Sequence, residues 1–283
     1  MKKIVLTLMG GFINTTAGLF PRWNGNYAFN LLCKVKRVGI SEKGRAFLGR
    51  AETRFLDIDG HSAALHKWGS GDKNLLFLHG WMSNSQRWLP YVEGLDLHEY
   101  TVYALDAPGH GMAKGNHLNV EIYRNAYVNV VATIGEIDTL VCHSLGSLVG
   151  GYGYLVNSQI PVKKYVIMGS PSGMDAIFVY FDELLGLSKR AVQNLEAKIN
   201  EVLELPHQEI SMANFFQKVR QPALVVHDEL DRITPLEPIR KASEVNKEIE
   251  TFFVRGQDHN LKGSETVTRV LDFITEKVSV LQE

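Results

Sequence analysis

The sequence predicts an α/β fold in which a mostly parallel central sheet is flanked by helices and carries a small helical lid. Two observations favour this class. From about Ala51, short apolar runs alternate with longer helical stretches, which is typical of a parallel sheet covered on both faces. Residues 171–221 form an interval between two strands that is far longer than a crossover needs, and this surplus predicts the lid.

The first fifty residues lack the strand–helix rhythm and are expected to form an N-terminal helical extension. The basic and apolar start, Met1–Met9, also resembles a secretory signal, but Gly10 and Gly11 interrupt it. A cleaved signal therefore stays open as the alternative. No apolar run reaches the ~18 residues of a transmembrane helix. We expect a soluble, cytoplasmic protein that does not bind a membrane.

The core of the fold is expected over residues 51–170 and 222–283. Its first two strands, Arg54–Ile58 and Ala63–Trp68, flank Asp59-Gly60, a pair that suits a tight antiparallel hairpin. The other strands are short apolar runs, at Leu75–Leu78, Thr101–Leu105, Leu140–Val141, Tyr165–Met168, Ala223–Val226 and Ile249–Val254. The helices of the core are predicted at Ser85–Gly94, Val120–Ile134, Leu145–Val156, Leu236–Val245 and Ser264–Val280.

Composition excludes several function classes. The chain of 283 residues has 30 lysines and arginines against 31 aspartates and glutamates, a net charge of −1, so no broad basic surface favours nucleic acid. Its two cysteines, Cys33 and Cys142, lie far apart and outside any cysteine–histidine cluster, which argues against a disulfide framework and a zinc site. We expect no metal and no organic cofactor.

The most specific local signal is Cys142-His143-Ser144-Leu145-Gly146, between an apolar strand and a helix that starts with small residues. It matches the nucleophile elbow G-x-S-x-G except that cysteine replaces the first glycine. The sharp strand-to-helix turn exposes the serine and requires small neighbours. We therefore expect Ser144 to be a nucleophile.

A serine nucleophile needs a base that takes its proton and an acid that orients the base. Downstream of Ser144, His259 lies in a loop after the strand at Ile249–Val254. Two aspartates compete for the acid, Asp228 and Asp231, in the loop after the strand at Ala223–Val226. The order serine, acid, histidine is the order found in one large class of serine hydrolases.

At this point the chain resembles the α/β-hydrolase superfamily, from about Arg54 to its C-terminus. The resemblance is carried by His79-Gly80-Trp81, Asp106–Gly111, the elbow at Ser144, and the late aspartate and histidine, in this order at strand ends. It implies an oxyanion hole formed by the backbone N–H groups of Trp81 and Leu145.

The same resemblance favours Asp231 over Asp228 as the acid, because the family's acid precedes a Thr-Pro or Val-Pro pair and Thr234-Pro235 stands at that spacing. It also implies that His79 and the Asp106–Gly111 loop are structural. A substrate pocket is expected to include Met82, Phe178, Phe181 and Phe215, although apolar residues near a site are more often part of the core.

Together these features predict a serine hydrolase that cleaves a small-to-medium carboxylic ester through an acyl-serine intermediate. The expected partner is a small-molecule ester, and the oligomeric state stays open. Four alternatives remain: an amide hydrolase, an acyltransferase, a hydrolase of carbon–carbon bonds, and a non-catalytic ligand-binding protein of the same fold.

Overall fold

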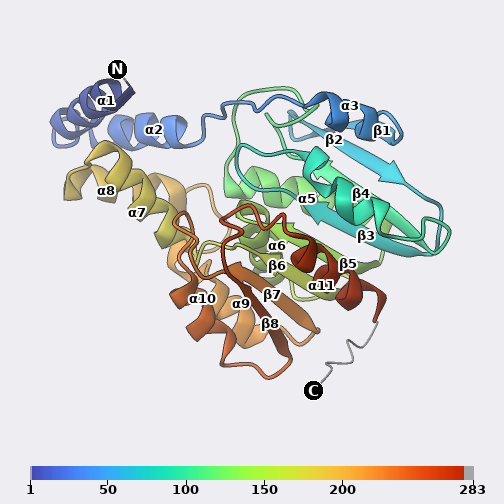
Figure 1. Cartoon of the computed structure of the whole chain (residues 1–283). Helices are drawn as coiled ribbons and strands as arrows, with labels where there is room; N and C mark the ends of the chain where they lie inside the picture. Colours follow the sequence, from blue (N-terminus) through green and yellow to red (C-terminus); the bar gives the residue numbers. More distant parts are fainter. Residues whose placement is uncertain (1, 277–283) are drawn as a thin grey trace.

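The computed structural model describes residues 2–276 and contains an eight-stranded sheet (Figure 1). The strand order β1-β2-β4-β3-β5-β6-β7-β8 is antiparallel at the first two pairings and parallel from β4 onward. The strands are β1 (Glu52–Ile58), β2 (His61–Trp68), β3 (Lys73–Leu78), β4 (Tyr100–Asp106), β5 (Ile137–His143), β6 (Val162–Met168), β7 (Ala223–Asp228) and β8 (Ile249–Val254). This arrangement confirms the predicted α/β class.

The hairpin between β1 and β2 turns at Asp59-Gly60, as the sequence indicates. Both residues have positive φ angles, 53° and 79°, which glycine and aspartate tolerate better than most residues do. Ile58 pairs with His61 in the resulting two-residue turn.

Helices cover both faces of the sheet, and others lie together at one end of the molecule (Figure 1). They are α1 (Lys2–Thr16), α2 (Pro21–Leu32), α3 (Glu42–Leu48), α4 (Leu89–Glu93), α5 (Val120–Ile134), α6 (Leu145–Val156), α7 (Met174–Leu185), α8 (Lys189–Asn200), α9 (Met212–Lys218), α10 (Leu236–Ser243) and α11 (Ser264–Thr275). On β5, Leu140 and Cys142 belong to the core shared with α5 and α6, whereas Val141 belongs to the core shared with α4 and α11. Successive side chains of β5 point to opposite faces of the sheet, so this one strand contributes to both cores.

Three helix predictions differ from the structure at their ends, and one of them, predicted over Leu236–Val245, already ends at Ser243. The expected helix Ser85–Gly94 is a 3₁₀ turn over Ser85–Trp88 followed by α4. Pro90 has no backbone N–H, so it cannot continue the hydrogen-bonding pattern of the preceding turn. Helix α11 ends at Thr275, and residues 277–280 of the predicted helix lie outside the described residues.

The interval 171–221 contains α7, α8 and α9, with a 3₁₀ turn over His207–Glu209. Figure 1 shows α7 and α8 beside α1 and α2, at one end of the molecule. Within residues 2–276, no helix combines the length and apolar character needed to cross a bilayer.

Candidate active site

Ser144 occupies a sharp turn between β5 and α6. Its backbone has φ 54° and ψ −121°, a conformation that costs a non-glycine residue about 1–3 kcal/mol. The Ser144 N–H donates to the Met168 carbonyl at 2.8 Å, which ties the turn to the end of β6. A Cβ on Gly146 would lie 2.4 Å from the Leu78 carbonyl oxygen, so the second glycine of the motif lets α6 approach β3 closely.

Cys142 stands where the elbow motif has its first glycine, and α6 leaves room for its side chain. Cys142 is fully buried beneath α6, where a Cβ on Gly150 would lie 2.9 Å from its sulfur. Burial raises the pKa of this thiol well above its usual value. Cys142 is thus a small packing residue, held as a neutral thiol.

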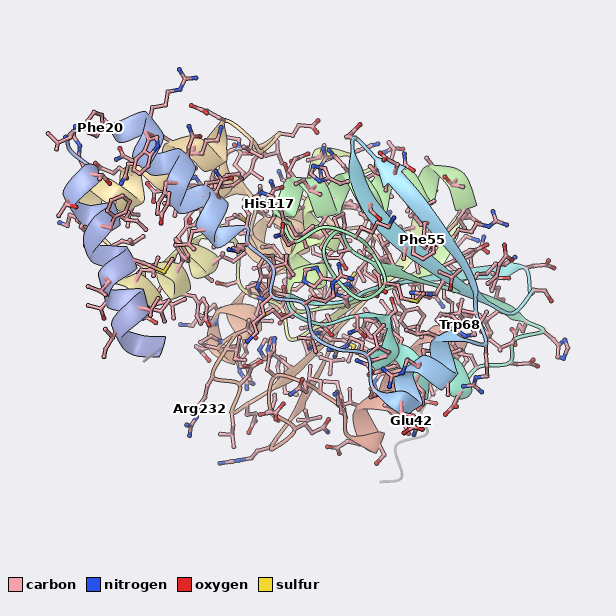
Figure 2. All side chains as sticks on the ribbon, turned by 90° about the horizontal axis from the view of Figure 1, so that it is seen from above. Phe20, Glu42, Phe55, Trp68, His117 and Arg232 are labelled. Atoms are coloured by element: carbon pink, nitrogen blue, oxygen red, sulfur yellow. The ribbon has the colours of Figure 1, made fainter. Side chains whose placement is uncertain are left out.

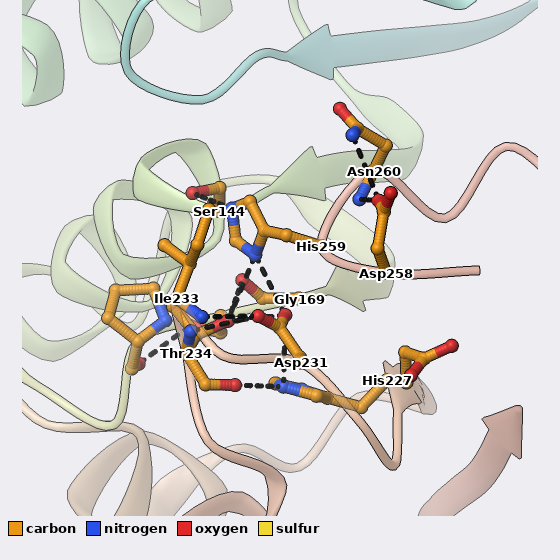
Figure 3. A network of polar contacts seen from close by, with 12 residues as sticks. Ser144, Gly169, His227, Asp231, Ile233, Thr234, Asp258, His259 and Asn260 are labelled. Carbon is orange, nitrogen blue, oxygen red and sulfur yellow. Dashed lines mark hydrogen bonds and ion pairs between the residues drawn. The ribbon is translucent and has the colours of Figure 1, made fainter. Parts of the chain in front are cut away.

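His259 connects Ser144 to Asp231 (Figure 3). Its Nε2 lies 2.8 Å from Ser144 Oγ, and its Nδ1 lies 2.8 Å from Asp231 Oδ2. A carboxylate only accepts hydrogen bonds, so Nδ1 carries the proton and Nε2 is left to accept from the serine hydroxyl. This is the tautomer in which a histidine can act as a base toward serine.

Asp231 is held as an anion by its own loop. Burial alone would raise the pKa of its carboxyl group, but hydrogen bonds from His259 and Thr234 outweigh burial and lower the pKa to about 2. The backbone N–H groups of Ile233 and Thr234 donate to Oδ1 at 2.8 and 3.0 Å, and the Thr234 hydroxyl lies 2.8 Å from Oδ2. The Asp231 side chain is therefore charged and fixed in orientation.

The competing aspartate, Asp228, is directed elsewhere. Its carboxylate accepts from the Leu230 N–H at 2.7 Å and from the Gln257 N–H at 2.5 Å. Asp228 thus joins the loop of Asp231 to the loop of His259 without contacting the imidazole. Of the two candidates, the structure brings only Asp231 to His259.

The backbone of the His259 loop has two further supports that sequence reasoning missed. His143 Nε2 donates to the His259 carbonyl at 2.8 Å, and the Arg87 guanidinium donates to the Asn260 carbonyl at 3.0 Å. Burial lowers the pKa of His143 well below its usual value, so this imidazole is neutral. The position of His143 inside the elbow motif was the only sequence signal for its place near the site.

In the sequence, Thr234 indicates only the spacing between the acid and the following proline. Its hydroxyl oxygen also lies 3.1 Å from His259 Nδ1 and 3.2 Å from the Gly169 carbonyl oxygen. It therefore bridges the acid, the histidine and the end of β6.

The segment Gly80-Trp81 lies against Ser144. A Cβ on Gly80 would lie 2.7 Å from Ser144 Cβ and 3.2 Å from Ser144 Oγ. Among the described residues, the N–H groups of Trp81 and Leu145 are not donors in the backbone hydrogen bonds that join loops and helix ends. Leu145 follows Ser144 directly and Trp81 follows Gly80, so within residues 2–276 the N–H groups of both residues lack such a backbone acceptor.

His79 and neighbouring residues hold the segment Gly80-Trp81 in place. The His79 Nε2 accepts from the Ala107 N–H at 3.1 Å, so Nδ1 carries the proton and donates to the Gly80 carbonyl at 2.7 Å. Burial is the main cause that lowers the pKa of His79 to about 3. His110 accepts from the Met82 N–H at 3.1 Å and packs against the Trp81 ring.

Asp106 anchors the loop that follows β4. Its carboxylate accepts from the N–H groups of Ser85 and Met112 at 2.7 and 2.8 Å, and His66 Nε2 lies 3.1 Å away. Although burial opposes ionisation, hydrogen bonding by His66 and the nearby histidines holds the pKa of Asp106 far below its usual value. Asp106 and His110 both have structural partners.

The four residues expected in a substrate pocket divide into two groups. Met82 is 46% exposed and follows Trp81 directly. Phe215 is fully buried among Tyr154, Tyr165 and Phe216, so its side chain belongs to the core beneath α6, and its predicted place in the pocket is corrected.

Phe178 and Phe181 are also buried, at 6% and 5% exposure, and belong to the main core cluster. The Phe178 ring packs against His207, within the insertion. The apolar composition of the insertion could not distinguish residues that attach it to the body from residues that face a ligand.

Among residues 2–276, no group of three or more histidine, cysteine, aspartate or glutamate side chains is arranged to hold a metal ion. The arrangement at Ser144 can perform nucleophilic chemistry with side chains alone, because it provides a hydroxyl, a base and a fixed anion.

Comparison with known proteins agrees with this arrangement. The model of the alpha/beta hydrolase family matches residues 75–259, which include the elbow, Asp231 and His259. Over 142 residues, 48% of this chain, the sequence is 30% identical to a pimeloyl-[acyl-carrier protein] methyl ester esterase from Pseudoalteromonas atlantica, of which it covers 54%.

A second curated relative is the dihydrolipoyllysine-residue acetyltransferase component of an acetoin cleaving system from Cupriavidus necator. The identity is 31% over 101 residues, 36% of this chain and 26% of that protein. The chain thus spans about a quarter of one relative's length and about half of the other's.

Among solved structures, a bacterial membrane phospholipase A superposes with a TM-score of 0.62 at 18% identity, covering 98% of this chain and 99% of that chain. At this identity the likeness concerns the fold.

Proposed function

Because the chain belongs to the alpha/beta hydrolase family, we propose that it is a serine hydrolase that cleaves small-to-medium carboxylic esters through an acyl-serine intermediate. One observation carries this proposal: the His259 imidazole lies 2.8 Å from Ser144 Oγ on one side and 2.8 Å from Asp231 Oδ2 on the other. The esterase relative from Pseudoalteromonas atlantica supports the choice of an ester.

In the first half-reaction, Ser144 Oγ attacks the ester carbonyl carbon while His259 Nε2 takes the hydroxyl proton. The carbonyl oxygen becomes negative and receives hydrogen bonds from the N–H groups of Trp81 and Leu145, each of which is worth about 2.7–4 kcal/mol to the transition state. The carbon–oxygen bond of the ester then breaks, and His259 returns the proton to the departing alcohol. The acyl group remains on Ser144.

In the second half-reaction, water takes the place of the serine hydroxyl. His259 Nε2 accepts a proton from water as its oxygen attacks the acyl carbon, and then delivers this proton to Ser144 Oγ as the acid leaves. The Asp231 carboxylate stabilises the imidazolium in both halves. No other reactant is consumed.

We propose three regions for this enzyme: residues 1–50 as a helical extension, residues 51–170 and 222–283 as the hydrolase core, and residues 171–221 as a lid. The lid assignment is supported by the entry to α7, since Gly169 follows β6 and its Cβ would lie 3.5 Å from the His259 carbonyl oxygen. Ligands of open α/β sheets bind at this carboxyl edge. Met82 is the predicted pocket residue best suited to contact substrate.

Acyl transfer is the second candidate, favoured by the match to the acetyltransferase component from Cupriavidus necator. It uses the same acyl-serine but an alcohol or thiol in place of water. Product analysis with added acceptor alcohols separates the two, because a transferase forms a new ester in preference to the free acid. A carbon–carbon hydrolase would be identified in the same panel by its inactivity on simple esters.

The decisive experiment combines a fluorophosphonate probe with a panel of esters. We expect one labelled serine, Ser144, and loss of both labelling and hydrolysis in Ser144→Ala with an unchanged melting temperature. Ser158→Ala, at an exposed serine remote from the elbow, is the control and should behave as wild type. Absence of labelling and turnover in the wild type would instead identify a ligand-binding protein.

A further inference from the structure

An exposed apolar surface extends over α1 and the start of α2. We call it the N-terminal apolar face, and it consists of Ile4, Val5, Leu8, Phe12, Leu19, Phe20 and Trp23. These side chains are between 47% and 75% exposed, and they account for seven of the seventeen large exposed apolar side chains in the described chain. Figure 2 shows Phe20 at the outer end of this helical cluster. Such a concentration marks an interaction site.

Helix α1 is apolar on both of its sides. Leu6 and Met9 pack against the core and Ile13 is fully buried, whereas Ile4, Leu8 and Phe12 recur every four residues and so share the outer side. The sequence has no charged residue from position 4 to position 21. A helix with apolar residues on two sides is best accommodated by an apolar surrounding on both of them.

The inner side of α1 is fixed, so the outer side cannot turn inward. A Cβ on Gly10 would lie 1.8 Å from the Leu185 carbonyl oxygen, which shows how closely α1 approaches α7. Asn14 donates to the Gly186 carbonyl at 2.8 Å and accepts from the Ser188 N–H at 2.7 Å. These contacts hold α1 in an orientation that leaves the N-terminal apolar face exposed.

The charge around this face is one-sided. Residues 1–41 contain six lysines and arginines and no aspartate or glutamate, although the whole chain has a net charge of −1. Arg22 and Lys34 are exposed. Basic residues beside an apolar helix complement an anionic lipid surface.

Aromatic residues sit at the junction of α1 and α2. The rings of Trp23 and Tyr27 stack with centroids 5.3 Å apart, and Phe12 packs edge-on against both. Trp and Tyr favour the boundary between headgroups and acyl chains. At about 1.5 Å per residue, the 15 residues of α1 reach about 22 Å, less than the roughly 30 Å of a hydrocarbon core, so the helix fits in the plane of the interface.

We propose that the N-terminal apolar face docks this protein on an anionic lipid bilayer, with α1 lying at the boundary between headgroups and acyl chains. This proposal differs from the sequence-based expectation of a protein that does not bind a membrane. It is independent of the proposed hydrolysis, because none of its residues belongs to the site at Ser144.

The test is cosedimentation of full-length Ser144→Ala protein with vesicles of phosphatidylcholine alone or mixed with phosphatidylglycerol. We expect sedimentation with the mixed vesicles, weakened by salt, and a blue shift of tryptophan emission. The double variant Leu8→Gln/Leu19→Gln should lower partitioning about a hundredfold, since each leucine contributes about tenfold. Arg22→Gln/Lys34→Gln should weaken binding to the mixed vesicles only.

The matched control is Phe55→Gln/Val245→Gln, which removes two apolar side chains that are 59% and 63% exposed on β1 and after α10. It should bind as the parent does. Should Leu8→Gln/Leu19→Gln fold poorly by circular dichroism, Ile4→Gln/Phe20→Gln tests the same face.

Equal binding by the face and control variants, or no binding to mixed vesicles, would overturn the proposal. A lipid-free dimer that Leu8→Gln/Leu19→Gln dissociates would also overturn it, because a second copy would then occupy the face. In the wild-type background the face variant should hydrolyse water-soluble esters at the normal rate, which separates this proposal from the proposed chemistry.

Discussion

Replacing Gly80 by alanine tests the proposed oxyanion hole at its closest approach to the nucleophile. The new Cβ would lie 2.7 Å from Ser144 Cβ. Carbon atoms in contact lie about 3.5–4.0 Å apart, so the Gly80-Trp81 segment and Ser144 must separate by about 1 Å. A misplacement of about 1 Å at reacting groups costs about 10²-fold in rate, which corresponds to about 2.7 kcal/mol of transition-state stabilisation.

The assay is kcat/KM for p-nitrophenyl butyrate, measured together with the melting temperature. We expect Gly80→Ala to lower kcat/KM about a hundredfold, mostly through kcat, because the lost interaction forms only in the transition state. Gly39→Ala is the control, since no atom lies within 4 Å of its added Cβ and its φ is not positive. A folded Gly80→Ala enzyme within about threefold of wild type would refute the placement of Trp81 beside the oxyanion.

Three further outcomes are expected. Asp231→Asn should lower kcat by about 10⁴-fold, because an amide favours the wrong histidine tautomer. Asp228→Asn should instead affect the melting temperature more than kcat. If steady-state kinetics ranked the two variants the other way round, Asp228 would be the acid. The free energy of unfolding, measured with urea, should fall as pH drops below about 6.5. The reason is that His79 and His143 are neutral in the folded protein and take up protons when it unfolds. Each residue should lower this free energy by up to about 1.4 kcal/mol per pH unit. For His79 this loss should continue down to about pH 3, and an unfolding energy that stays constant from pH 7 to 4 would contradict the buried neutral state. In a series of p-nitrophenyl esters, kcat/KM should rise with acyl length and then fall, since each buried CH₂ adds about 0.8 kcal/mol until the pocket is full; a flat profile would exclude an apolar acyl pocket.

The order of strands and helices was readable because its signals are local. Helices Val120–Ile134 and Leu145–Val156 begin and end where the sequence predicts, the first with Asn119 accepting from the Ile122 N–H as an N-cap. The turn at Ser144 was visible through its small neighbours. Pro90, by contrast, divides a predicted helix, because one missing N–H outweighs the helical pattern around it.

The supports of the site were much harder to predict. Thr234 and His143 act through hydrogen bonds between segments far apart in the sequence, and nothing in their own neighbourhood indicates these partners. Phe215 illustrates the opposite error: an aromatic residue in an insertion fits a pocket or a core equally well until its neighbours are known.

The anchoring of the His259 backbone has a consequence for the timing of the proposed reaction. Once Ser144 Oγ is esterified, it has no proton left to donate to the imidazole, and one of the two hydrogen bonds that align the ring is lost. His143 and Arg87 hold the carbonyl groups of His259 and Asn260 without involving the serine oxygen. The backbone of His259 therefore stays anchored while the proposed acyl-serine waits for water, and the contact of Nδ1 with Asp231 still orients the ring.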